Sequence, residues 1–115
     1  ALGGSQLAHV DADVLFVRWQ QERDVASRDE LFARFEPLAG KLARRYVGRE
    51  PFDDLMQVAS LALVKAIDRF DPERETAFSS FAVPTILGEL KRHFRDKGWS
   101  VRVPRDLQEL ELVIA

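Results

Sequence analysis

The chain contains no cysteine among its 115 residues. Disulfides and thiolate metal sites are therefore excluded, and the absence suits a reducing compartment. No apolar run approaches the roughly 20 residues that cross a bilayer, and the amino end lacks the basic-then-apolar order of a signal peptide. We therefore expect a cytoplasmic protein without a membrane partner.

Side chains suited to catalysis are also few. His9 and His93 are isolated from each other in the sequence, and no serine lies in a nucleophile-elbow motif. Asp53 and Asp54 are adjacent, but a metal site would need a further ligand at helical spacing, so a solvated helix start explains them better. We expect no enzymatic activity, no cofactor and no metal.

What the chain does have is apolar residues at helical spacing. Hydrophobic residues make up 46% of the sequence, which is enough for one globular core. Their recurrence at steps of three and four predicts an all-α fold, a compact bundle of about four to five helices. We assign residues 11–105 to this domain, residues 1–10 to a flexible end or a cloning remnant, and residues 106–115 to the start of a truncated following helix.

The first predicted helix is capped by Asp11 or Asp13 and runs to about Glu22. Its apolar positions are Val14, Leu15, Val17 and Trp19. They offer only a modest core-facing side.

A second, longer helix is predicted from a capping-box pattern, in which Glu30 follows Ser27 by three residues. Pro37 lies inside this segment and should kink or interrupt the helix, because it lacks a backbone donor. Gly48 then favours an end near Val47.

The third predicted helix begins at Asp53, and at about 3.6 residues per turn its residues divide into two arcs. One arc is apolar and is expected to face the core: Leu55, Met56, Ala59, Ala62, Leu63, Ala66, Ile67 and Phe70. The opposite arc contains Asp53, Asp54, Gln57, Ser60, Leu61, Val64 and Asp68. Leu61 and Val64 are either single exposed apolar residues, which are normal, or a small docking patch for a partner protein.

A fourth helix is predicted after Asp71 and Pro72, with Pro84 in its first turn. Its core stripe consists of Val83, Ile86, Leu87, Leu90 and Phe94, and its other face collects Gly88, Lys91, Arg92 and Arg95. Gly88 leaves room either for a DNA strand or for a closely packed helix. Gly98 is expected to end this helix, and a fifth helix should follow Pro104.

Charge is unevenly distributed, although the formal net charge is only −2. Acids predominate over residues 11–30. Over residues 89–105 the balance reverses, with Lys91, Arg92, Arg95, Lys97, Arg102 and Arg105 against Glu89 and Asp96. Such a local basic stripe predicts phosphate contact, and a solvated charged face is the alternative explanation.

Three successive stretches resemble region 2 of the bacterial sigma factors of RNA polymerase, especially the stress and sporulation class of alternative sigma factors. They read DDLMQVASLALVKAIDRFD, FSSFAVPTILGELKRHFRDKGW and SVRVPRDLQEL, within a resemblance that runs from Arg28 to Leu110. The resemblance implies an all-helical domain that binds core RNA polymerase and the promoter −10 element in transcription initiation.

The resemblance also implies a role for particular residues. The clamp coiled coil of the largest polymerase subunit would be contacted by Asp53, Asp54, Gln57, Ser60, Leu61 and Val64. Factors of this class are commonly held inactive by an anti-sigma protein, which would use the same surface.

On the DNA side, the unpaired non-template strand would be held by Phe70, Arg74, Phe78, Ser80 and Phe81. Phosphates or the duplex edge would be met by Lys91, Arg92, Arg95, Lys97 and Arg102, on a helix that also presents Thr85 and Gly88. Aromatic faces stack on splayed bases for about 1 to 3 kcal/mol each. From spacing alone, Phe78 and Phe81 could equally be core residues.

One departure from the family concerns Pro84 and Thr85, which stand where primary sigma factors carry paired tryptophans that wedge the duplex open. This puts the melting power of the chain in question and fits the alternative class. The rival interpretation from the residues is a helix-turn-helix regulator that reads duplex DNA. Such a regulator needs a short turn and polar base-reading residues at the start of its basic helix, where this chain has Phe78 to Phe81.

Overall fold

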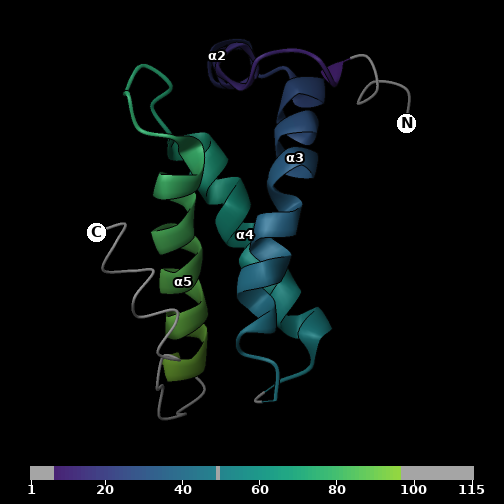
Figure 1. Cartoon of the computed structure of the whole chain (residues 1–115), viewed down its shortest axis with the longest axis vertical. Coiled ribbons are helices and arrows are strands. Elements are labelled where there is room, and N and C mark those ends of the chain that lie inside the picture. The colour runs from purple at the N-terminus through teal and green to yellow at the C-terminus, as the bar shows by residue number, and fades with distance from the viewer. Residues whose placement is uncertain (1–6, 49, 97–115) are drawn as a thin grey trace.

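The computed structural model describes residues 7–48 and 50–96. In that part of the chain it has four helices: α2 (Ala12–Glu22), α3 (Val25–Arg44), α4 (Phe52–Arg69) and α5 (Phe78–Asp96). α4 lies between and behind α3 and α5, and α2 is seen nearly end-on beside the start of α3 (Figure 1). The predicted all-α bundle is confirmed, whereas Gly98 and the predicted fifth helix lie outside the described residues.

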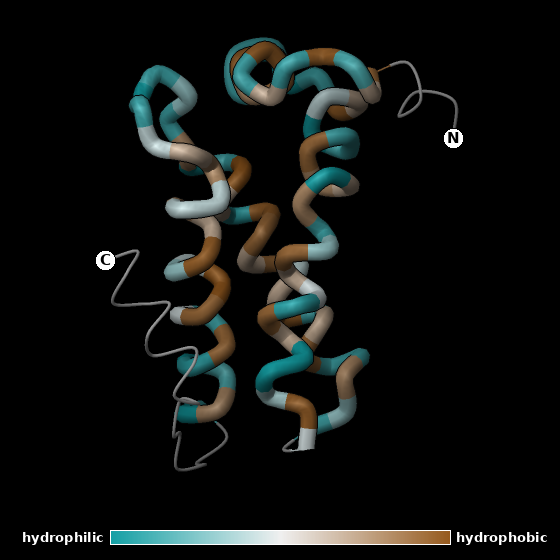
Figure 2. The backbone as a smooth tube through the Cα atoms, in the orientation of Figure 1, coloured by the Kyte–Doolittle hydropathy of each residue, from teal (hydrophilic) through white to brown (hydrophobic). Residues whose placement is uncertain are grey.

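α4 forms the centre of the core because both α3 and α5 pack on it. Its buried residues are Leu55, Ala59, Ala62, Leu63, Ala66 and Ile67. The small alanine side chains let the neighbouring helices approach closely. Figure 2 shows α4 as largely hydrophobic, whereas the connection over residues 70–77 is hydrophilic. The predicted apolar arc of α4 is thus confirmed, with Met56 half-buried at its edge and packed against the core.

An aromatic cluster joins α2 to the connection between α4 and α5. Phe16 is 1% exposed, and its ring centroid lies 4.9 Å from that of Phe70 and 5.0 Å from that of Phe78. The predicted core-facing side of this helix omits Phe16 and includes Val14 and Val17 instead. That assignment is wrong, because both valines are exposed.

The predicted start of the second helix is also wrong. α3 begins at Val25 with Asp24 at its N-cap position, and Ser27 lies buried inside the helix, where its hydroxyl donates to the Asp24 carboxylate at 2.5 Å. Glu30 does not reach back to close a capping box. It accepts a hydrogen bond from Nε of Arg34 at 2.8 Å.

α3 continues through Pro37 to Arg44 without interruption. Proline at this point deprives the Ala33 carbonyl of its helical donor, but Ala33 and Pro37 are both exposed, so water can satisfy that carbonyl. The helix ends three residues before the predicted Val47. Gly48 adopts a φ of 114°, which a side chain would disfavour.

α5 begins at Phe78, well before the predicted start beside Pro84. The segment Phe78 to Phe81 is therefore the first turn of a helix and not a separate turn. Pro84 lies in the helix interior, where its missing N–H removes one backbone hydrogen bond. The first turn is held in place by Phe78, which packs into the aromatic cluster.

Residues 7–10, which the sequence placed in a flexible end, are held against α3 by Arg34. Its Nη2 donates to the carbonyl oxygens of Leu7 at 2.9 Å and Val10 at 2.6 Å. Leu7 and Val10 also pack against the core. Within residues 7–48 and 50–96, no helix combines the length and apolarity needed to cross a membrane.

Gln20 of α2 stabilises the carboxyl end of α4. Its Nε2 donates to the carbonyl oxygens of Ile67 at 3.0 Å and Phe70 at 2.7 Å, at a helix end whose carbonyls lack donors within the helix. We expect Gln20→Met, which keeps the length of the side chain, to lower the free energy of unfolding by about 1 kcal/mol. Urea denaturation followed by circular dichroism measures this change. Gln21→Met is the matched control, because Gln21 is exposed; equal losses in both variants would contradict the role of Gln20.

Candidate functional site

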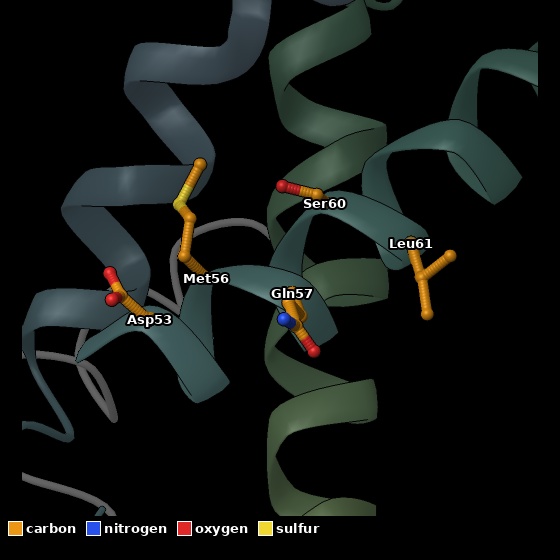
Figure 3. A pocket seen from close by; sticks show the side chains of 5 residues that line it. All are labelled: Asp53, Met56, Gln57, Ser60 and Leu61. Atoms are coloured by element: carbon orange, nitrogen blue, oxygen red, sulfur yellow. The ribbon is translucent and has the colours of Figure 1, made fainter. Parts of the chain in front are cut away.

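The polar arc of α4 forms an exposed face, which we call the docking face. It consists of Asp53, Asp54, Gln57, Ser60, Leu61 and Val64, all exposed or half-buried. Leu61 is 66% exposed, the largest value among the exposed large hydrophobic residues of the described chain. A shallow groove beside it is lined by Asp53, Met56, Gln57, Ser60 and Leu61 (Figure 3). The structure therefore brings the predicted residues together on one surface.

Met56 is a member of this surface that the sequence analysis assigned to the core. It is half-buried, and its side chain reaches toward α3 while it lines the groove (Figure 3). A Cβ at Gly40 of α3 would lie 3.8 Å from the Met56 sulfur. Met56 thus closes one side of the groove with a soft, adaptable side chain.

The start of α4 is acidic. Asp53 and Asp54 lie in its first turn, where negative charge is favoured by the helix dipole. Over residues 7–48 and 50–96 there is no group of three or more acidic, histidine or cysteine side chains that could hold a metal ion. Both carboxylates are exposed, and they form part of the polar rim of the docking face.

A second groove separates the docking face from α5. Its α4 side includes Leu61 and Val64, and Nζ of Lys65 crosses the groove to Oε1 of Glu89 at 3.0 Å. The pKa of the Glu89 carboxyl is lowered, first by this hydrogen bond and then by nearby positive charges, against the opposing effect of burial. Nearby, Nε2 of His93 lies 2.5 Å from Oε2 of Glu50, so α5 is tied both to α4 and to the segment before it.

A pocket beside the carboxyl end of α4 combines aromatic, basic and polar side chains. We call it the aromatic pocket; it is lined by Arg69, Phe70, Asp71, Arg74, Thr76, Ser80, Phe81 and Pro84. Four of the residues predicted to hold a DNA strand meet here, namely Phe70, Arg74, Ser80 and Phe81. Sequence reasoning missed Arg69, Asp71 and Thr76, because the lining of this pocket depends on how the end of α4, the 70–77 connection and the start of α5 come together.

The two aromatic residues at the start of α5 have different environments. Phe78 is 6% exposed and contacts Phe16, Phe35 and Phe70 at centroid distances of 5.0, 4.6 and 5.2 Å. Its burial argues against base stacking, so of the two explanations left open by the sequence, the core residue fits Phe78. Phe81 is half-buried, lies 5.8 Å from Phe70 and lines the pocket.

The outward side of α5 forms a basic face, made of Thr85, Gly88, Lys91, Arg92 and Arg95. Gly88, Arg92 and Arg95 are exposed. Among the described residues, a Cβ added at Gly88 would meet nothing within 4 Å, so close packing against α2, α3 or α4 is not the reason for this glycine. Lys97 and Arg102, predicted to extend the basic face, lie outside the described residues.

The chain matches the family model described as Sigma-70 region 2 over residues 31–100. It is 58% identical over 86 residues to RNA polymerase sigma factor SigF of Mycobacterium tuberculosis, covering 74% of this chain and 33% of that protein. It is 39% identical over 107 residues to RNA polymerase sigma-B factor of Bacillus subtilis, covering 92% of this chain and 41% of that protein. The chain thus spans less than half the length of these relatives.

Proposed function

This chain belongs to the Sigma-70 region 2 family, and we propose that it is the part of an alternative sigma factor that binds core RNA polymerase and captures the promoter −10 element. The observation that carries the proposal is the separation of two surfaces on one small bundle. The docking face occupies α4, whereas the aromatic pocket and the basic face follow the start and the outward side of α5. One rigid unit can therefore hold polymerase and DNA at the same time.

The docking face supports a protein partner, which in this proposal is the clamp coiled coil of the largest polymerase subunit. An exposed leucine surrounded by acidic and amide groups has the composition of a small interface, with an apolar centre and a polar rim. The adjoining grooves on both sides of Leu61 would accept side chains from a partner helix.

The pocket and the basic face support an unpaired DNA strand. Phe81 offers a partly exposed ring for stacking, and Arg69 and Arg74 add positive charge beside it. Along α5, Arg92 and Arg95 are exposed, and they lie where the phosphates of the bound strand would run.

The helix-turn-helix alternative is less well supported. The helix that carries the basic face follows the whole 70–77 connection rather than a short turn, and its first turn is anchored by buried Phe78. A recognition helix would need its amino-terminal side chains free to reach base edges.

Template binding by a reconstituted complex tests the proposal. The protein is combined with core RNA polymerase, and binding to a fork template with a single-stranded −10 element is compared with binding to the fully paired template. We expect association with polymerase and a preference for the fork. Absence of polymerase binding by the folded protein would contradict the proposal.

The basic face should contribute to DNA affinity equally whether the DNA is single-stranded or duplex. We expect Arg95→Ala to weaken binding to single-stranded and duplex DNA alike, and to reduce the slope of log affinity against log salt by about 0.7 to 0.9, since one phosphate contact releases one set of counterions. Titrations at several salt concentrations measure both effects. Lys41→Ala on α3 removes an exposed charge elsewhere and should leave the slope unchanged; if it has the same effect as Arg95→Ala, general charge rather than the basic face explains the binding.

An anti-sigma partner should compete with polymerase. Because the docking face is the exposed apolar surface of α4, a cognate inhibitor is expected to cover Leu61 and exclude the clamp coiled coil. Competition between the inhibitor and a clamp coiled-coil peptide, followed by fluorescence anisotropy, measures this. Simultaneous binding of both without mutual effect would rule out occlusion of the docking face.

A further inference from the structure

Pro84 changes the hydrogen bonding of the wall of the aromatic pocket. In an α-helix each carbonyl accepts the N–H of the residue four positions later, and proline has no N–H. The carbonyl of Ser80 therefore has no helical donor at position 84. A helical carbonyl points along the axis toward that donor position, so the Ser80 oxygen lies between Ser80 and Pro84, which both line the pocket.

Two other acceptors nearby already have partners. The carbonyl of Phe81 accepts a hydrogen bond from Oγ1 of Thr85 at 3.1 Å. In the carboxylate of Asp71, Oδ1 accepts the backbone N–H of Glu73 at 3.0 Å and Oδ2 lies 3.8 Å from Nε of Arg74. Within the pocket wall, the Ser80 carbonyl is thus the acceptor that has lost its regular helical donor.

We propose that the Ser80 carbonyl selects the base that enters the aromatic pocket, by accepting a hydrogen bond from an exocyclic amine. The inference rests on the proposed function, because an unpaired base must first stack beside Phe81. Adenine and cytosine carry an amine donor where thymine carries a carbonyl oxygen, and that oxygen would face the Ser80 oxygen without a proton between them. The pocket volume of about 300 Å³ is at the lower end for small-ligand sites and suits one base.

The selectivity should follow from the energetics of buried hydrogen bonding. A base with the amine gains a hydrogen bond, whereas a base without it leaves the carbonyl unpaired behind a stacked ring. We therefore expect a base with an exocyclic amine to bind about threefold to tenfold more tightly than the same ring without it. Pro84 thereby acts as a specificity-determining residue through the N–H that it lacks.

The test uses the whole 115-residue chain, alone and bound to core RNA polymerase. Single strands of about twelve thymines carry one central adenine, cytosine or purine, the last being adenine without its amine. Because thymine has no exocyclic amine, only the central base can supply the donor. Fluorescence anisotropy gives the affinity for each strand, and circular dichroism verifies that each variant is folded.

Two variants separate the missing N–H from the proline ring. Pro84→Ala restores the N–H and should abolish the ratio between the adenine and purine strands. A second protein carries lactic acid at position 84, which has the side chain of alanine but an ester oxygen in place of the N–H. This protein should keep the ratio, although it too has lost the ring.

The outcomes are distinct. The proposal is supported if the original and ester proteins bind the adenine strand more tightly than the purine strand and Pro84→Ala does not. A ratio that survives in Pro84→Ala overturns it and assigns the amine to another acceptor, such as Asp71. If the original protein binds the adenine and purine strands equally tightly, the role of the Ser80 carbonyl is refuted. The proposed capture of a single strand is not affected by that result. Failure of the folded, polymerase-bound protein to bind any strand overturns the inference together with the proposed DNA function.

Discussion

Leu61→Asp should weaken association with core RNA polymerase by about 2 kcal/mol or more, which is about thirtyfold in affinity. Leu61 lies at the centre of the docking face, between the two grooves. An aspartate there would place a charge against the apolar side chains of a partner and add to the negative charge of Asp53 and Asp54. The affinity is measured by titrating labelled core polymerase with the protein.

The same substitution should leave the fold intact, because 66% of Leu61 is exposed to solvent already. Val25→Asp is the matched control: Val25 is 50% exposed in the first turn of α3, and the substitution makes the same change in charge. We expect this control to bind polymerase normally. Unchanged polymerase affinity in Leu61→Asp, with normal helical content, would remove the docking face from the proposal.

The arc of α4 could be predicted from the sequence because a long helix with one strongly apolar side has one favourable orientation. Leu55, Ala59 and Leu63 recur on the side that faces the core, and all three are fully buried. Leu61 falls on the opposite side and is exposed, as expected. Met56, at the boundary of the arc, is half-buried: it packs against the core and also lines the groove.

The orientation of α2 could not be predicted in the same way. Val14, Leu15, Phe16 and Val17 are four consecutive apolar residues, so every side of the short helix offers an apolar face and the periodicity does not decide between them. The structure buries Phe16 because its ring fits against Phe70 and Phe78. The orientation of α2 therefore depends on side chains that are far from it in the sequence.

The start of α5 was misplaced for a related reason. Proline is favoured in the first turn of a helix, so the sequence predicts a helix start beside Pro84. The preceding turn is stabilised instead by the tertiary packing of Phe78, which local sequence preference does not include. With the helix starting at Phe78, Pro84 becomes an interior residue, and the Ser80 carbonyl loses its regular helical donor.

The grouping of the pocket residues was partly predictable. The resemblance to sigma factors pointed to Phe70, Arg74, Ser80 and Phe81, and the structure places all four around one pocket. It could not separate Phe78 from Phe81, since residues three apart lie on neighbouring parts of a helix surface. The difference arises because α2 covers Phe78 and leaves Phe81 at the pocket.

Phe81→Leu should lower the affinity for the single-stranded −10 element by about 1 to 3 kcal/mol while duplex affinity changes little. Leucine keeps much of the side-chain volume but lacks the flat aromatic face on which a base can stack. Phe81 is half-buried, so only a modest loss of stability is expected. Affinities for single-stranded and duplex DNA, measured in the polymerase-bound protein, test the difference between the two forms.

Phe78→Leu is the matched control for this prediction, because it makes the same chemical change three residues away in the same helix. Phe78 lies inside the aromatic cluster with 6% exposure, so its replacement should lower the unfolding free energy more than Phe81→Leu does, since the cluster loses ring contacts and volume. The fraction that remains folded should still bind the single strand with normal affinity. If Phe81→Leu instead destabilised the fold and the folded fraction kept its strand affinity, both rings would be core residues, and strand capture would have to rest on the basic face alone.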